Sequence, residues 1–173
     1  MKKVCLIIGA GAGIGGTVGA KFAAHGYHAA LARRSDAAGL NRLVSEIAAR
    51  GDSASGHLLN ATEEGAIEKL VEEVEKLGPI EVVLFNLGAQ IGNRALDQTA
   101  LKTFELGWKM ACFGLFRLAK AVLPAMEARG SGTLLVTSAT AAVRGNAGQH
   151  SHAAAMGGRR MLCQTLNAEY APK

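Results

Sequence analysis

The chain has 173 residues, of which 49% are hydrophobic and 19% are charged, so it can bury one substantial core. We therefore expect a single domain over residues 1–173. The formal net charge is +5, yet basic residues are interspersed with acidic ones, as in "EEVEK", and aromatic residues make up only 5%. Nucleic-acid-binding surfaces gather basic and aromatic residues on one face, so this composition argues against a nucleic-acid partner.

The N-terminal apolar run and the cysteines bear on cellular location. "VCLII" is too short for a signal peptide or a membrane span, and Gly9 ends it, so we expect no association with a membrane. Cys5, Cys112 and Cys163 are far apart in apolar segments, which predicts buried thiols rather than disulfides or a metal site. Both features favour a cytoplasmic protein in a reducing compartment.

Strands and helices alternate from the N-terminus. "KKVCLIIG" is a continuous apolar run ended by glycine, which is typical of a strand buried on both faces of a parallel sheet, and a helix is predicted over residues 13–25. "YHAALARR" predicts the second strand, and "AAGLNRLVSEIAAR" predicts a helix with Gly51 beyond its end. "SGHLLN" predicts a short third strand at residues 55–60.

The same alternation continues to the end of the chain. "TEEGAIEKLVEEVEKLG" predicts a helix capped by Thr62. "IEVVLFNLGA" predicts the fourth strand and a turn, and residues 100–128 predict a long helix interrupted near Gly107 or Gly114. "GTLLVTSAT" predicts the fifth strand, and a last helix is predicted over residues 149–170.

Regular alternation of strands and helices indicates the fold class. Joined by right-handed crossovers, such elements predict an α/β fold, a doubly wound parallel sheet of the Rossmann type with helices on both faces. Ligands of these sheets bind beyond the carboxyl ends of the strands, where the strand order reverses. We therefore expect the functional residues in the turns that follow the strands.

The turn after the first strand, "IIGAGAGIGG", carries glycines in two frames. Gly11, Gly13 and Gly16 satisfy G-x-G-x-x-G, while a G-x-x-x-G-x-G spacing is satisfied by Gly9, Gly13 and Gly15. Either frame permits a tight turn, lets the backbone approach a pyrophosphate, and leaves amides at a helix N-terminus aimed at negative charge. Because the turn follows a buried strand and opens a helix, it predicts a dinucleotide site.

The end of the second strand indicates which dinucleotide is bound. An acidic residue there would accept hydrogen bonds from the ribose hydroxyls and repel a 2′-phosphate. This chain has Arg33 and Arg34 instead, and a guanidinium binds phosphate through two parallel hydrogen bonds. NADP(H) is therefore favoured over NAD(H), although exposed arginines at strand ends are also common as solvated charges.

Further motifs follow the glycine turn in order. The turn has Ile14 between its last two motif glycines, "NLG" spans Asn86 to Gly88 after the fourth strand, and "LAKAVLPAM" and "GTLLVTSAT" come next. Together they resemble the short-chain dehydrogenase/reductase family over essentially the whole chain, and Asn60 stands where that family usually has an aspartate near the adenine. The resemblance implies a Rossmann-type fold, a nicotinamide cofactor and a homo-oligomer.

The chain departs from that family at the residues that carry its chemistry. The family uses a Ser on the fifth strand, a Tyr-x-x-x-Lys pair on the next helix and an Asn on the long fourth helix. Its Tyr exchanges the proton at the substrate oxygen, and its Lys assists the Tyr and holds the nicotinamide ribose. Here the alignment places His152 at Tyr and Met156 at Lys; the Ser position falls on Ser138 or Ala139, and the Asn position near Ala111.

No shift of register restores the pair, because this helix contains no Tyr-x-x-x-Lys. Arg159 and Arg160 lie about two helical turns beyond His152, so we expect them to approach the cofactor only if the helix starts elsewhere. His150 and His152 are two residues apart, which on a helix points them to different sides. We therefore expect no metal site here.

Two functions follow from these residues. In the first, the protein is an NADP(H)-binding oxidoreductase for a carbonyl or alcohol substrate, with His152 as proton donor and Ser138 holding the substrate oxygen. Met156 offers neither a charge nor a hydrogen-bond donor, so the catalytic set is degraded and efficient turnover is not expected. In the second, the protein is a non-catalytic nucleotide sensor or oligomer partner that the cofactor stabilises.

The end of the chain bears on the substrate. Members of the family usually continue through two further strands and a mobile substrate-covering segment, and this sequence stops before them. We therefore expect a dinucleotide-binding domain without these C-terminal strands and the covering segment: either the sequence is a fragment of a longer protein, or its ordered part ends here, or the protein lacks much of the substrate pocket. The long helix and the last helix are surfaces through which relatives associate, so their apolar positions favour a homo-oligomer.

Overall fold

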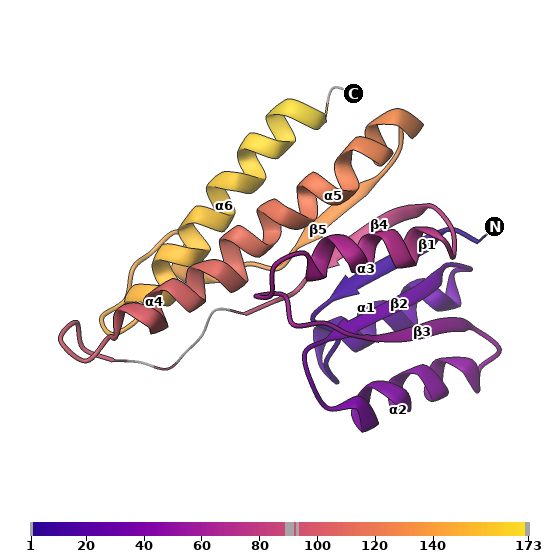
Figure 1. Cartoon of the computed structure of the whole chain (residues 1–173), viewed down its shortest axis with the longest axis horizontal. Coiled ribbons are helices and arrows are strands. Elements are labelled where there is room, and N and C mark those ends of the chain that lie inside the picture. The colour runs from indigo at the N-terminus through magenta and orange to yellow at the C-terminus, as the bar shows by residue number, and fades with distance from the viewer. Residues whose placement is uncertain (1, 89–91, 93, 172–173) are drawn as a thin grey trace.

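The structure, a computed structural model, describes residues 2–88, 92 and 94–171. Its parallel sheet has the strand order β3-β2-β1-β4-β5, so the chain switches direction across the sheet beside β1 (Figure 1). This confirms the doubly wound α/β sheet. The strands are β1 Val4–Ile8, β2 His28–Arg33, β3 Ser53–Leu58, β4 Ile80–Phe85 and β5 Thr133–Val136.

β1 lies at the centre of the sheet and is buried along its whole length. Val4, Leu6 and Ile8 face one core cluster, and Cys5 and Ile7 face a second cluster on the opposite side. A strand covered on both faces needs apolar side chains at every position, which is why its sequence runs apolar rather than alternating.

Helices cover both faces of the sheet. α1 (Ile14–Ala24) and α2 (Ala37–Ala48) pack on one face, and α3 (Ala66–Glu75) and α5 (Gly114–Arg129) pack on the other. α6 (His150–Tyr170) runs beside the long helix that precedes β5, and the pair extends past the sheet (Figure 1). α6 remains helical through its two glycines, as the sequence predicts.

The long helix predicted over residues 100–128 is interrupted between its two glycines. α4 (Leu101–Trp108) passes into a π-helical turn over Lys109–Phe113, and α5 continues directly from it at Gly114. π turns widen the helix by one residue per turn and are frequent at functional sites. Here the widened turn places Ala111 in the interior, against α6.

Two predicted boundaries are wrong. β3 begins two residues earlier than its sequence suggests, because Ser53 pairs in register with His28 at the start of β2. α3 begins after Gly65, which adopts a left-handed conformation with φ +72, so Thr62 does not cap the helix. The Thr62 hydroxyl instead donates to Asn60 Oδ1 at 2.8 Å.

The cysteines are free thiols, and burial raises the pKa of Cys5 to about 12. Cys5 is fully buried as predicted, whereas Cys112 and Cys163 are half-buried. In the part of the chain that the structure describes, no helix combines the length and the apolar character that crossing a membrane requires.

Candidate functional site

At two positions in the glycine turn between β1 and α1, a side chain would collide with neighbouring backbone atoms. Gly9 has φ +98, and a Cβ there would lie 2.7 Å from the Asn86 carbonyl oxygen. A Cβ at Gly15 would overlap the Gly9 carbonyl oxygen. These glycines are therefore required by the fold itself, because any side chain would push the first turn of α1 off the end of β1.

Gly11 and Gly13 of the same turn face open space. A Cβ added at either one would meet no described atom within 4 Å, so packing within the chain does not explain them. Gly13 is the N-cap residue of α1, whose first-turn amides have no acceptor inside the helix. The open space in front of Gly13 thus leaves room for a phosphate group, which the amides and the positive end of the helix dipole would hold.

The end of β4 is tied to this turn through Asn86. Its backbone amide donates to the Ile8 carbonyl at 2.8 Å, and its side-chain Nδ2 donates to the Gly9 carbonyl at 3.0 Å. Gly88 is exposed, with open space where a Cβ would stand. The structure therefore brings the glycine turn and the "NLG" segment together at the carboxyl edge of the sheet.

The arginines after β2 differ in their surroundings. Arg33 Nη1 lies 3.1 Å from Asp36 Oδ2, and Asp36 also accepts from the Gly39 amide at 2.9 Å, which caps α2. Asp36 adopts a left-handed conformation with φ 63. Arg34 is exposed and forms no ion pair with a described residue. The sequence identified both arginines but did not indicate that a carboxylate holds the first.

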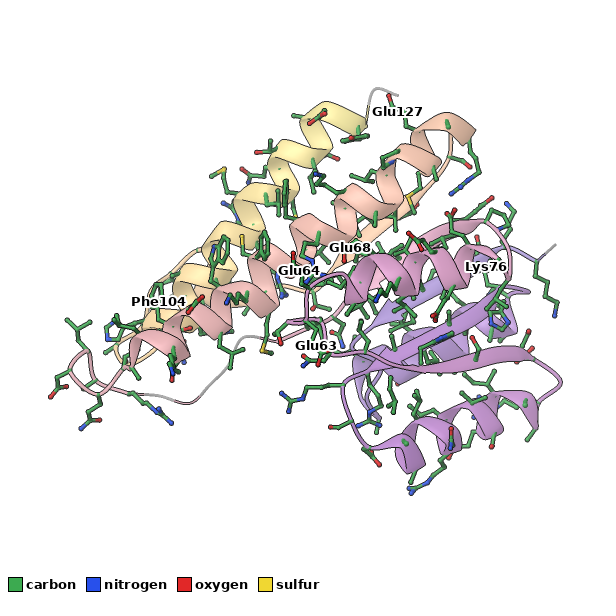
Figure 2. All side chains as sticks on the ribbon, in the orientation of Figure 1. Glu63, Glu64, Glu68, Lys76, Phe104 and Glu127 are labelled. Atoms are coloured by element: carbon green, nitrogen blue, oxygen red, sulfur yellow. The ribbon has the colours of Figure 1, made fainter. Side chains whose placement is uncertain are left out.

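Asn60 uses its side chain to shape the approach to α3. Its Nδ2 donates to Glu63 Oε1 at 2.9 Å, and its Oδ1 accepts from the Thr62 hydroxyl. The turn is tied to α5 by Arg117, which donates to the carboxylate of Glu68 at 2.9 and 2.6 Å and to the Ala61 carbonyl at 3.2 Å. Figure 2 shows Glu68 at the side of α3 that α5 passes. These contacts fix the loop that follows β3.

The Glu68–Arg117 pair is also electrostatically favourable. The hydrogen bond from Arg117 lowers the pKa of the Glu68 carboxyl below its usual value, and the same bond raises the pKa of Arg117. Both groups therefore stay ionised at neutral pH, so the loop after β3 keeps this tie under ordinary conditions.

The region where the alignment expects the catalytic residues is largely apolar. Met156 is only 3% exposed and packs with Ala111 and Ala155, and Ala139 and Ala142 lie against them. Met156 stands where the alignment expects Lys, and Ala111 stands near the expected Asn. These two residues therefore pack together in one small apolar cluster. Of the two residues considered for the Ser position, Ala139 faces this cluster, whereas Ser138 is exposed at the end of β5.

His152 lies in the first turn of α6 and is half-buried. Its Nδ1 is buried and has no hydrogen-bond partner among the described residues, so no carbonyl or carboxylate orients the ring. The neighbouring Ser151 hydroxyl instead donates to the carbonyls of Thr103 at 3.2 Å and Phe104 at 3.0 Å, which anchors α6 on α4. Figure 2 labels Phe104 on α4.

Arg159 is buried beside the carboxyl ends of β4 and β5. The Arg159 side chain is 1% exposed and donates to three backbone carbonyls. The acceptors are Ala111 at 2.9 Å, Thr137 at 3.0 Å, and Leu87. The guanidinium also lies 5.0 Å from the ring centroid of Phe85. Because α6 starts as predicted, the expectation that Arg159 does not contact the cofactor stays a prediction.

Comparisons with known proteins agree with this geometry. The family described as short chain dehydrogenase matches residues 3–173. The chain is 29% identical over 166 residues to 7alpha-hydroxysteroid dehydrogenase of Escherichia coli (strain K12), covering 95% of this chain and 64% of that protein. The chain thus spans less than two thirds of the length of that relative.

Solved structures show the same likeness. A short-chain dehydrogenase from Rhodopseudomonas palustris superposes with a TM-score of 0.94 at 33% identity, covering 98% of this chain and 79% of the other. A gluconate 5-dehydrogenase from Burkholderia cenocepacia in complex with NADP and tartrate gives a TM-score of 0.87 at 25% identity, covering 98% and 66%. An NAD+-bound xylitol dehydrogenase gives 0.91 at 25% identity, covering 98% and 65%. The fold, the glycine turn and the family match agree, and the chain belongs to the short-chain dehydrogenase family.

Proposed function

We propose that the chain binds NADP(H) across the carboxyl edge of the sheet. The observation that carries this proposal is the open space in front of Gly13, where a glycine that packing does not require stands at the N-terminus of α1. The pyrophosphate would bind there. The other proposed cofactor-binding residues lie in the same turn or after the next strands: Gly9, Ile14, Gly15, Arg33, Arg34, Asn60, Asn86 and Gly88.

The preference for NADP(H) over NAD(H) is supported by the pair of arginines after β2. Arg34 is exposed and forms no ion pair with a described residue, so its guanidinium is available to a 2′-phosphate. Arg33 can join it only in competition with Asp36, which lies 3.1 Å away. Since one similar structure holds NADP and another NAD+, the relatives alone do not decide the preference.

The reaction we propose is hydride exchange between the dinucleotide and a small carbonyl or alcohol, at low turnover. When bound, the dinucleotide supplies or accepts the hydride. His152 would carry the proton to or from the substrate oxygen, and Ser138 would hold that oxygen. Met156 and Ala111 can neither donate a hydrogen bond from their side chains nor carry charge, so His152 acts without the support that a lysine would give.

A homo-oligomer in the cytoplasm completes the proposal. The outer surface of α4, the π turn and α5 carries exposed aromatic rings, and Trp108 and Phe113 stack there with centroids 5.2 Å apart. Exposed rings of this kind favour burial against a second copy of the chain. Sedimentation equilibrium of the wild type measures the association, and a monomer at all concentrations would contradict it.

Nucleotide titration followed by thermal unfolding tests the function. NADPH is expected to raise the Tm of the wild type more than NADH does, because ligands that bind only the folded state stabilise it. Arg34→Asp should remove the difference between the two nucleotides. A carbonyl panel is then read by the loss of NADPH absorbance in the wild type and in His152→Ala.

Each outcome has a distinct meaning. Turnover that disappears in His152→Ala supports the oxidoreductase with His152 as proton carrier. Binding without turnover on any substrate would instead identify a nucleotide sensor. If neither nucleotide changes the Tm, the binding proposal is wrong.

A further inference from the structure

Arg159 carries a buried charge that the proposed reaction does not use. It is the only charged residue of the described part of the chain that is fully buried, and its guanidinium is occupied by carbonyls of Ala111, Thr137 and Leu87. Carbonyl oxygens satisfy the hydrogen bonds of a guanidinium, but they carry no net charge. The electrostatic effect of the charge on its surroundings therefore remains.

Among the described residues, no negative group pairs with this charge. Within residues 2–88, 92 and 94–171, no carboxylate forms an ion pair with Arg159. The titratable groups that interact with it are the thiols of Cys112 and Cys163, and burial raises the pKa of both, so they are neutral at pH 7. Burial lowers the pKa of Arg159 to about 10, so the guanidinium itself stays protonated.

The order of the strands indicates where the charge of Arg159 lies relative to the proposed dinucleotide. The glycine turn after β1 fixes the pyrophosphate end of the proposed site, and the arginines after β2 mark the adenosine end. The other half of a dinucleotide must then run toward the carboxyl ends of β4 and β5. Leu87 and Thr137 follow these two strands, and both accept hydrogen bonds from Arg159, so the charge lies beneath the nicotinamide half.

We propose that Arg159 makes the site bind the reduced dinucleotide more tightly than the oxidised one. The oxidised nicotinamide ring carries a positive charge and the reduced ring is neutral, while the rest of the molecule is the same. Arg159 does not touch the ring and acts on it through space. This inference rests on the proposed NADP(H) site, and it adds the preferred redox form.

The expected size of the preference follows from Coulomb's law. At an effective dielectric of about 20, a tenfold difference in affinity equals the repulsion of two unit charges roughly 12 Å apart, so the charge can act on the ring without contact. Salt screens a buried charge less than an exposed one, so the preference should persist at physiological ionic strength. A protein loaded with the reduced form is set to reduce a carbonyl rather than to oxidise an alcohol.

Titration calorimetry with NADPH, NADP+ and adenosine 2′,5′-bisphosphate tests the inference. The wild type is expected to bind NADPH about tenfold more tightly than NADP+. The neutral variants Arg159→Gln and Arg159→Met should reduce that ratio at least threefold, mainly by tighter binding of NADP+, whereas Arg159→Lys should keep it. Adenosine 2′,5′-bisphosphate lacks the nicotinamide, so its affinity should be unchanged in every folded variant.

The outcomes separate this inference from the proposed function. If the wild type binds none of the three ligands, the NADP(H) site is wrong and the inference is wrong with it. If the wild type binds NADPH and NADP+ equally, the inference alone is wrong, whether or not the variants fold. A neutral variant that binds adenosine 2′,5′-bisphosphate normally and keeps the wild-type ratio would also overturn it, since its fold and adenosine site are intact.

Discussion

The two halves of the proposed site are built from different kinds of side chain. In the adenosine half, Arg33 pairs with Asp36 at 3.1 Å, and the polar groups there face solvent. In the nicotinamide half, Met156 packs on Ala111 in an apolar cluster, and the charge of Arg159 is buried behind backbone carbonyls. Both halves keep polar groups that a ligand could reach, but in the second half these are the exposed Ser138 and the half-buried His152 beside the apolar cluster.

Under the proposed function, binding and turnover would depend on separate parts of this fold. Phosphate binding needs a glycine turn, a helix N-terminus and accessible cations, and the half around β1 and β2 supplies all three. Proton transfer needs a donor held in a defined orientation, and His152 Nδ1 has no such partner among the described residues. We therefore expect the chain to bind a nucleotide even if turnover is slow.

The largest expected effect is a loss of stability that distinguishes Gly15 from Gly13 in the turn after β1. Gly15→Ala places a methyl group on the Gly9 carbonyl oxygen, so it should destabilise the fold by roughly 3 kcal/mol. Gly13→Ala meets open space and should cost less than about 1 kcal/mol, yet its methyl group would stand in the proposed phosphate position and should abolish NADPH binding. Urea unfolding and NADPH titration of both variants measure this.

The two glycine variants also control one another. A Gly13→Ala protein that binds NADPH as tightly as the wild type would show that the phosphate does not bind in front of Gly13. Equal stability of both variants would show that the turn can relax around the Gly15 methyl group.

A smaller loss of stability is expected from adding a charge to the apolar cluster around Met156. Met156→Lys buries an ammonium one helical turn from Arg159 and should destabilise the protein by about 3 kcal/mol at pH 7 relative to Met156→Leu. Burial and repulsion hold the lysine pKa of the folded state below that of the unfolded chain. The unfolded state then binds more protons, so the loss of stability should shrink as the pH rises from 7 to 9.

Thermal unfolding of both variants across this pH range gives the measurement. Equal stability of Met156→Lys and Met156→Leu at pH 7 would mean that the ammonium reaches water, and that the cluster around Met156 is open. In that case the apolar character of the nicotinamide half would not exclude a restored lysine.

The sequence predicts the fold well, because the fold depends on local patterns. The apolar run of β1 and the glycine spacing each follow from rules that act within a few residues. The start of α3 could not be predicted in the same way. Thr62 and Gly65 are both acceptable first residues for a helix, and the choice depends on hydrogen bonds that Asn60 makes in the folded chain.

The nicotinamide half was harder to predict because its contacts join distant segments. The alignment identifies Met156, but it does not show that Ala111 and Ala139 meet it in one cluster. Arg159 could be recognised only as a basic residue on an otherwise apolar helix face. Its acceptors on the π turn and after β4 and β5 become neighbours only through the packing of α6 on the sheet.

The smallest expected effect is a change in nucleotide affinity at the adenosine half of the proposed site. Asp36→Asn removes the charge that holds Arg33 but keeps an oxygen for the Gly39 amide, and asparagine tolerates the left-handed conformation at this position. Arg33 is then free to bind the 2′-phosphate, so the affinity for NADPH should rise about threefold and that for NADH should not change. Calorimetric titration with both nucleotides measures the ratio. Adding Arg33→Gln to Asp36→Asn should cancel the gain; an equal gain for NADH would show that Arg33 does not recognise the 2′-phosphate.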